Sequence, residues 1–403
     1  MDESRRQRTS NLHRFGAAHA TRSLGWAVVD LLLAWHLHAK LGLTGVQTGW
    51  MLFALLALGG VATVLVGLAL GRHGATGDMV VRLQLPATIA TGILLVLQFR
   101  VEGVVALVII GLLFRIAYAV QDVTQNMLSS LLPADEADIV RYARLRVMLS
   151  AVTRCCVVLG FALLLPSGIG AMLIAIALAM IAAALSLRRL VFPVRPGIGA
   201  LRDSLPSAED GIPSLLAAWV VAAMVLPTLQ RLLIFAPAVG GSTFAGAWLL
   251  SGFCAGSVIG PTLWQTIDRH VLVAMIAGSG LTIIMPVPPA LQAGIGGDWW
   301  HFAGAVVHGI AVSLVGVRLW ATTSRVARRK RRGRSRDGLV FGSVILTIHL
   351  ASAAGMLVLG PLIEGFEAGH TGGMLIALAL TVLGGLLVGG VGSGRNRSSQ
   401  RFI

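Results

Sequence analysis

The sequence has little charge, few cysteines and none of the common catalytic motifs. Only 12% of its 403 residues are charged, whereas a soluble protein of average composition carries about 25%. Three cysteines cannot build the disulfide framework of a secreted scaffold. They are Cys155, Cys156 and Cys254, which lie in apolar runs and are expected to be small buried hydrophobic residues. No phosphate-binding Gly-x-x-x-x-Gly-Lys loop, His-Glu-x-x-His motif or Cys-x-x-Cys motif is present.

Long apolar runs dominate what is present. Apolar residues make up 56% of the chain and the mean hydropathy is +0.83. Because a helix needs about 20 apolar residues to cross a bilayer, these runs predict an all-α integral membrane protein with twelve transmembrane helices in two six-helix halves. The predicted spans are residues 16–39, 45–71, 79–98, 103–128, 147–167, 169–187, 212–236, 243–266, 270–292, 299–321, 340–363 and 371–391.

One long polar loop separates the two sets of six spans. Residues 191–211 contain three prolines and several charges, which is typical of a linker. We therefore divide the chain into an N-terminal half (1–190), a cytoplasmic linker (191–211) and a C-terminal half (212–403).

Basic residues lie almost entirely on one side of the predicted spans. With the N-terminus in the cytoplasm, the outside loops hold only Lys40 and Arg100, in agreement with the positive-inside rule. Both termini are then cytoplasmic, and Arg22, Arg144 and Arg146 count with the inside segments. We expect the basic inside loops to contact anionic lipid headgroups rather than nucleic acid. The expected location is the plasma membrane, in a bacterium the inner membrane, with multiple crossings.

The fourth predicted span carries polar residues along one face. Spacings of three and four residues separate Arg115, Tyr118, Asp122, Gln125 and Ser129, which places them on one side of a helix. An ionisable group inside a bilayer costs at least about 2.5–3.5 kcal/mol, so this face should meet water, a solute or another polar helix. Two interpretations stay open. Either the face lines a solute cavity, or an internal Arg115–Asp122 ion pair only ties helices together.

The first predicted span repeats this pattern more weakly. His19, Ser23, Trp26 and Asp30 share one face. Asp30 is one of only two acids deep inside the predicted spans, and Arg115 is its candidate partner. A tryptophan beside polar groups suits an amphipathic ligand such as a sugar ring or a lipid headgroup, and the alternative is that Trp26 packs in the core.

Several motifs carry a family resemblance. Two halves of six spans with an inside linker resemble the major facilitator superfamily. Within it, the chain resembles the glycoside–pentoside–hexuronide:cation symporter family, the melibiose-carrier group. The segments that carry this resemblance are Phe15-Gly16-Ala17, Leu41-Gly42-Leu43-Thr44, Tyr118 to Asp122 with Leu131-Leu132-Pro133, Arg141-Tyr142-Ala143-Arg144, and Arg336 to Phe341.

The resemblance implies roles for three residues. Asp122 matches the family's span-four aspartate, which binds polar substrate groups, and Arg144 matches the arginine near the sugar site. His349 falls about where the family often has a span-eleven lysine. The family's cation site uses two aspartates in span two, and those positions are Gly59 and Thr63 here. We therefore expect protons rather than sodium as the coupling ion, and no further cofactor.

These observations favour a secondary active transporter that moves a small polar or amphipathic solute by alternating access. The solute is sugar-like by family resemblance, and a lysolipid or lipid is the alternative because the C-terminal half has few polar groups. A non-transporting membrane assembly or sensor protein of the same fold is a further alternative. No acid–base or metal constellation suggests an enzyme. The expected substrate and coupling residues are Asp122, Asp30, Arg115, Tyr118, Arg144, Trp26, Gln125 and His349.

Overall fold

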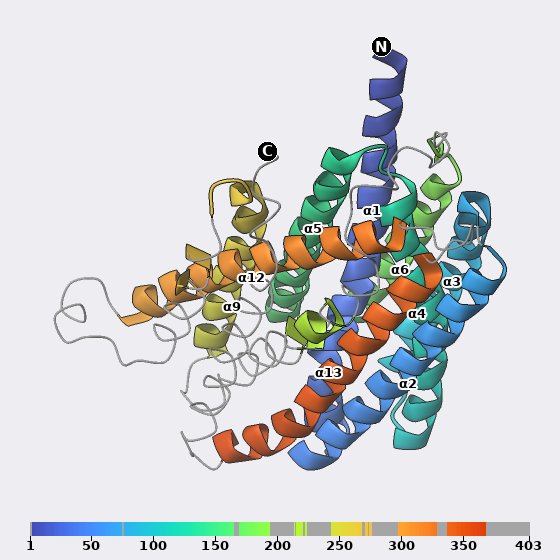
Figure 1. Ribbon diagram of the computed structural model, residues 1–403. Coiled ribbons are helices and arrows are strands. Elements are labelled where there is room, and N and C mark those ends of the chain that lie inside the picture. Colours follow the sequence, from blue (N-terminus) through green and yellow to red (C-terminus); the bar gives the residue numbers. More distant parts are fainter. Residues whose placement is uncertain are drawn as a thin grey trace.

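The computed structural model describes the chain as a bundle of helices (Figure 1). The described residues are 2–74, 76–164, 169–193, 213, 215–220, 222–223, 243–267, 271–272, 274–275, 297–328 and 337–367. Most of the seventh, ninth and twelfth predicted spans and of the linker lies outside them. The main helices are α1 (Asp2–Trp35), α2 (Gly45–Arg72), α3 (Gly77–Gln98), α4 (Val104–Leu131), α5 (Glu136–Leu164), α6 (Ile169–Leu187), α9 (Thr243–Ile259), α12 (Gly297–Arg328) and α13 (Asp337–Glu367).

Several of these helices are built to cross a membrane. Within the described residues, six helical segments are long and apolar enough: Gly45–Arg72, Gly77–Gln98, Val104–Leu131, Ile169–Leu187, His301–Arg328 and Asp337–Val358. The chain is therefore a multi-pass membrane protein. The total of twelve spans, the division into halves and the cytoplasmic location of both termini stay predictions.

The start of a helix is where sequence and structure differ most. The bounds predicted for α2, α3, α4 and α6 are confirmed to within about three residues. The first and fifth predicted spans, which start at 16 and 147, begin inside longer helices, because α1 begins at Asp2 and α5 at Glu136. Hydropathy detects the apolar part of a helix and misses a polar extension beyond the bilayer. At α5, Asp135 caps that extension by accepting a 2.9 Å hydrogen bond from the backbone N–H of Asp138.

The start of α2, at its predicted outer end, carries conventional helix-start signals. Thr44 accepts a hydrogen bond from the backbone N–H of Gln47 at 3.2 Å, and the Gln47 side chain accepts from the backbone N–H of Thr44 at 3.0 Å. This reciprocal capping box fixes the helix start. Gly42 precedes it with a φ of 67°, a left-handed conformation that a glycine adopts without strain.

Helices α2 and α13 run side by side and antiparallel, with their backbones in contact (Figure 1). Glycines on both helices make this possible, and we call the row the glycine seam: Gly45, Gly49, Gly60 and Gly67 on α2, and Gly338, Gly342 and Gly360 on α13. A Cβ atom at Gly49 would lie 2.7 Å from the carbonyl oxygen of Met356. The seam joins an element of the predicted N-terminal half to one of the predicted C-terminal half.

Further contacts join the halves at the predicted cytoplasmic end. The end of α4 and the start of α5 meet the end of α12 and the start of α13. The interactions between them include an Arg325–Glu136 ion pair and three hydrogen bonds: Ser129 with Ser324 at 3.2 Å, Ser130 to Asp337 at 2.9 Å, and Arg328 to the Pro133 carbonyl oxygen at 3.2 Å. This end of the bundle is held by these polar contacts and by apolar side chains of the same helices that pack together.

The burial of one of the three cysteines differs from the expectation. Cys254 of α9 is buried and Cys155 of α5 is half-buried, but Cys156 is exposed. The expectation that all three are buried is therefore wrong for Cys156, because successive residues of a helix point in different directions. The Cys155 and Cys254 thiols lie within hydrogen-bonding reach of each other across the contact between α5 and α9.

Candidate functional site

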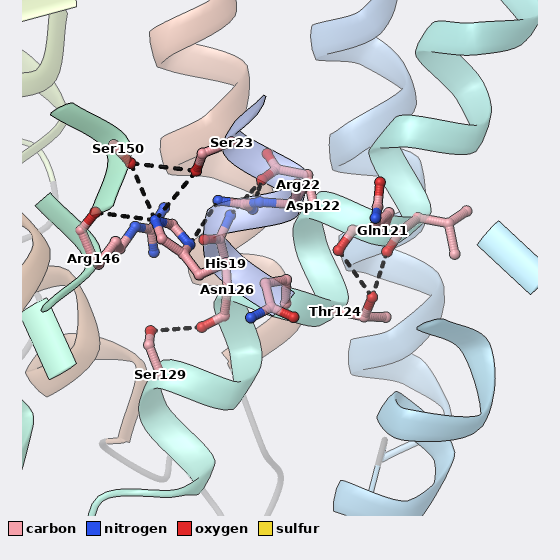
Figure 2. A network of polar contacts seen from close by, with 12 residues as sticks. His19, Arg22, Ser23, Gln121, Asp122, Thr124, Asn126, Ser129, Arg146 and Ser150 are labelled. Atoms are coloured by element: carbon pink, nitrogen blue, oxygen red, sulfur yellow. Dashed lines mark hydrogen bonds and ion pairs between the residues drawn. The ribbon is translucent and has the colours of Figure 1, made fainter. Parts of the chain in front are cut away.

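Asp122 lies at the centre of a buried polar cluster formed by α1, α4 and α5 (Figure 2). Arg22 of α1 forms an ion pair with the Asp122 carboxylate, and both residues are buried. Asn126, one turn further along α4, donates from Nδ2 to Oδ1 of the same carboxylate at 3.1 Å. Arg22 is therefore a partner of Asp122 that the sequence analysis did not name, and the expected alternative of an Arg115–Asp122 pair stays a prediction. The polar face of α4 meets another polar helix.

His19 connects this ion pair to α5. Its Nδ1 atom lies 3.1 Å from Nη2 of Arg22, and its Nε2 atom lies 3.1 Å from both the Arg146 carbonyl oxygen and the Ser150 hydroxyl. Because a guanidinium can only donate, the geometry makes Nδ1 the acceptor. The proton of the neutral ring then sits on Nε2, where the Arg146 carbonyl accepts it. The imidazole thus bridges a buried ion pair and the backbone of a neighbouring helix.

Trp26 forms a second cluster next to the first. Its ring stacks on Tyr118 of α4 with centroids 4.9 Å apart, and on His349 of α13 at 5.2 Å. The Arg115 guanidinium lies over the same ring, 4.8 Å from its centroid, a cation–π arrangement. The structure therefore brings together four of the residues expected from the sequence, and Trp26 packs against protein side chains from both predicted halves.

Arg146 of α5 is the third buried arginine of the region. Its guanidinium lies 3.2 Å from the centroid of the Trp320 ring of α12, so the contact crosses between the predicted halves. Arg144, which the family resemblance places near a sugar site, is half-buried on α5. The structure does not bring Arg144 into the cluster and brings Arg146 there instead, because two residues along a helix differ by about 200° in direction.

The other expected residues lie around these clusters. Gln125 donates to the Phe15 carbonyl oxygen of α1 at 3.4 Å, which ties α4 to α1. Asp30 is half-buried on α1, and its charge acts on the His349 ring together with the charges of Arg115 and Asp122. The expected Asp30–Arg115 pair stays a prediction.

Sequence reasoning missed Arg22, Arg146 and Trp320 as members of the site. Arg22 was counted with the inside segments although it lies six residues within the predicted span 16–39. A cation at that depth, three residues after His19 on one helix face, is a signal for an intramembrane partner. Arg146 had no such signal, because the predicted fifth span starts one residue after it. Its position follows from the early start of α5.

Comparison with known proteins identifies the fold of the chain. No family model and no curated protein matches the sequence. Solved structures do match. The human organic anion transporter MFSD10 (TETRAN) is 13% identical with a TM-score of 0.63, covering 94% of this chain and 99% of its own. The N162A variant of the Escherichia coli fucose:proton symporter FucP is 11% identical with a TM-score of 0.58, covering 95% and 99%.

A third structure, a bacterial homologue of the iron transporter ferroportin in its outward-facing state, is 15% identical with a TM-score of 0.60 and covers 94% of this chain and 98% of its own. All three are major facilitator transporters and none is an enzyme. The chain has the fold of the major facilitator superfamily. At these identities the likeness shows the fold alone, and the melibiose-carrier group stays a resemblance.

Proposed function

We propose that this protein, which has the major facilitator fold, is a secondary active transporter that moves a small polar or amphipathic solute by alternating access, coupled to protons. One observation carries the proposal: a buried ion pair, Arg22–Asp122, joined to His19, at the place where α1, α4 and α5 meet α12 and α13. Charged side chains that are buried within the membrane are usual at the solute and ion sites of transporters. Solute and ion sites of such transporters lie between two moving halves.

The polar contacts at the predicted cytoplasmic end support the same proposal. The Arg325–Glu136 ion pair and the Ser130–Asp337 hydrogen bond close that end. Water can replace these polar contacts when the halves move apart. A closed inner end beside a central charged cluster fits one state of an alternating-access cycle. Sugar-like solutes lead by family resemblance, and lysolipids are the comparison class.

Asp122→Asn in proteoliposomes tests the coupling. We expect uptake driven by a pH gradient to fall at least tenfold, because the variant side chain cannot load and release a proton, whereas exchange of solute across the membrane without a gradient continues. The measurement is uptake of labelled sugars and lysolipids with a pH or a sodium gradient. Asp135→Asn is the matched control, because Asp135 is an exposed carboxylate. Unchanged gradient-driven uptake in Asp122→Asn, or a requirement for sodium, contradicts proton coupling at this residue.

A further inference from the structure

Among the residues that the structure describes, the buried charges around Asp122 do not balance. Arg22, Arg115 and Arg146 are each at most 5% exposed, and Asp122 is 7% exposed. Asp30 is half-buried near the same cluster. Three cations therefore face two carboxylates even when Asp30 is counted. A buried charge is costly unless an opposite charge or hydrogen bonds compensate it, so the cluster favours one additional anion.

Arg146 is where the additional anion fits. Within the described part of the chain, no carboxylate lies within ion-pair distance of its guanidinium, while Asp122 is already bound by Arg22 and Asn126. The sequence places no third acid deep inside a predicted span. The guanidinium is held against the Trp320 ring at 3.2 Å, and the charges of Arg22 and Asp122 act on it. Arg146 is thus a buried, oriented cation inside the central cluster.

A second polar group points to the same region. Nδ1 of His349 is buried and has no hydrogen-bond partner within the part of the chain that the structure describes. Asp122 is close enough for its charge to act on the His349 ring and on Arg146 alike, so both groups lie around the same carboxylate. An imidazole nitrogen without a partner can donate to, or accept from, a ligand atom.

We propose that the transported solute is an organic carboxylate whose anionic group binds Arg146. The planar guanidinium matches a carboxylate through two parallel hydrogen bonds. This inference rests on the proposed transport function and adds the charge of the solute to it. Arg146 of α5 packs against Trp320 of α12, so a solute bound to Arg146 would lie at a contact between the two predicted halves.

Matched neutral and anionic probes test the inference on the full-length protein. Melting temperature in detergent and uptake in proteoliposomes are measured with glucuronate against glucose, and with phenylacetate against phenylacetamide. We expect only the two carboxylates to raise the melting temperature and to be taken up. Arg146→Gln should weaken carboxylate binding at least tenfold, and Arg146→Lys should weaken it less. Arg141→Gln is the control, because Arg141 is an exposed arginine on the same helix and should bind like the wild type.

The unliganded variants separate a binding role from a structural one. If Arg146 is held for the solute, Arg146→Gln keeps or raises the melting temperature without ligand, because it removes an uncompensated buried charge. A large fall in that melting temperature in both Arg146→Gln and Arg146→Lys, with carboxylate binding kept in the lysine variant at wild-type strength, overturns the inference.

The outcomes also distinguish this inference from the transport proposal. Uptake of glucose or phenylacetamide as strong as that of its carboxylate overturns the charge inference and leaves a transporter in place. Carboxylate binding that depends on Arg146, without uptake of any probe, supports the anion site and contradicts transport. Absence of both binding and uptake for every probe contradicts both.

Discussion

Arg22 and Asp122 are charged side chains that water barely reaches, and each depends on the other. Removing a charged group from water costs several kcal/mol, and a partner offsets this cost only while both are present. Asn126 and His19 add hydrogen bonds to the pair from α4 and α1. Loss of one partner therefore leaves the full desolvation cost of the other, whereas loss of both together leaves none.

A double-variant comparison tests this dependence. We expect Arg22→Leu alone to destabilise the protein by about 3–5 kcal/mol, since Asp122 then stays buried and unpaired. The double variant Arg22→Leu with Asp122→Leu should regain most of that stability and still lose proton-driven uptake. Unfolding in detergent, measured for both single variants and the double variant, gives the coupling energy. Purely additive losses would show that the pair does not act as a unit.

At the residue scale, the sequence predicts the acid of the site better than its partners. Asp122 stands out because an acid in an apolar run is rare, whatever its neighbours are. Its partner Arg22 lies a hundred residues earlier on α1, and such a pairing follows only from how the helices pack. Arg146 and Trp320 are further apart still, and neither a spacing nor a composition rule joins residues of α5 and α12.

The glycine seam is the dominant contact at the scale of helices. Gly67 and Gly342 bring the backbones of α2 and α13 together, as do Gly45 and Gly360 at the other end. Small residues permit close approach of membrane helices, where packing and not the hydrophobic effect drives association. Side chains added along this line would separate α2 from α13.

Two glycines on one helix provide a matched test of the seam. A Cβ atom at Gly67 would overlap the carbonyl oxygen of Gly338, whereas one at Gly71 would have its nearest neighbour, the Leu339 nitrogen, 4.0 Å away. We expect Gly67→Ala to destabilise the protein by about 1–3 kcal/mol through overpacking. Gly71→Ala should be neutral or stabilising by up to about 1 kcal/mol, as expected for alanine in a helix. Melting temperatures in detergent compare the two, and equal effects would contradict backbone contact at the seam.

At the helix scale, the apolar runs predict where a helix crosses the membrane. They fail to predict how far the helix extends beyond it. α2, α4 and α6 end close to where their apolar runs end. α1 and α5 continue for a dozen residues as polar helices, and the capping residue Asp135 was the local signal for the start of α5. That polar first part of α5 is the segment that carries Arg146 to the site.

At the scale of the whole molecule, α5 contacts both α9 and α12 of the predicted C-terminal half. Cys155 and Cys254 face each other in the first of these contacts. Alternating access requires the two halves to move relative to each other. A covalent link between α5 and α9 should therefore stop the cycle if this contact opens during transport.

Oxidation of the cysteine pair tests this motion. In a Cys156→Ala background, copper-phenanthroline should link Cys155 to Cys254 and abolish uptake, and dithiothreitol should restore it. A protease site placed within residues 191–211 reports the link, because the cleaved halves then stay together on a denaturing gel only when oxidised. The same treatment of Cys254→Ser is the control. Full uptake in the linked protein would show that α5 and α9 stay in contact throughout the cycle.

The stack of Trp26 on His349 has a consequence for the leakage of protons through the empty protein. In the empty protein, parting α1 from α13 would break this contact, with nothing to replace it. A solute that touches the same rings would supply replacement contacts as the halves separate. If the protein is the proton-coupled carrier proposed above, its empty form is thus held back from opening, and turnover without cargo does not dissipate the proton gradient.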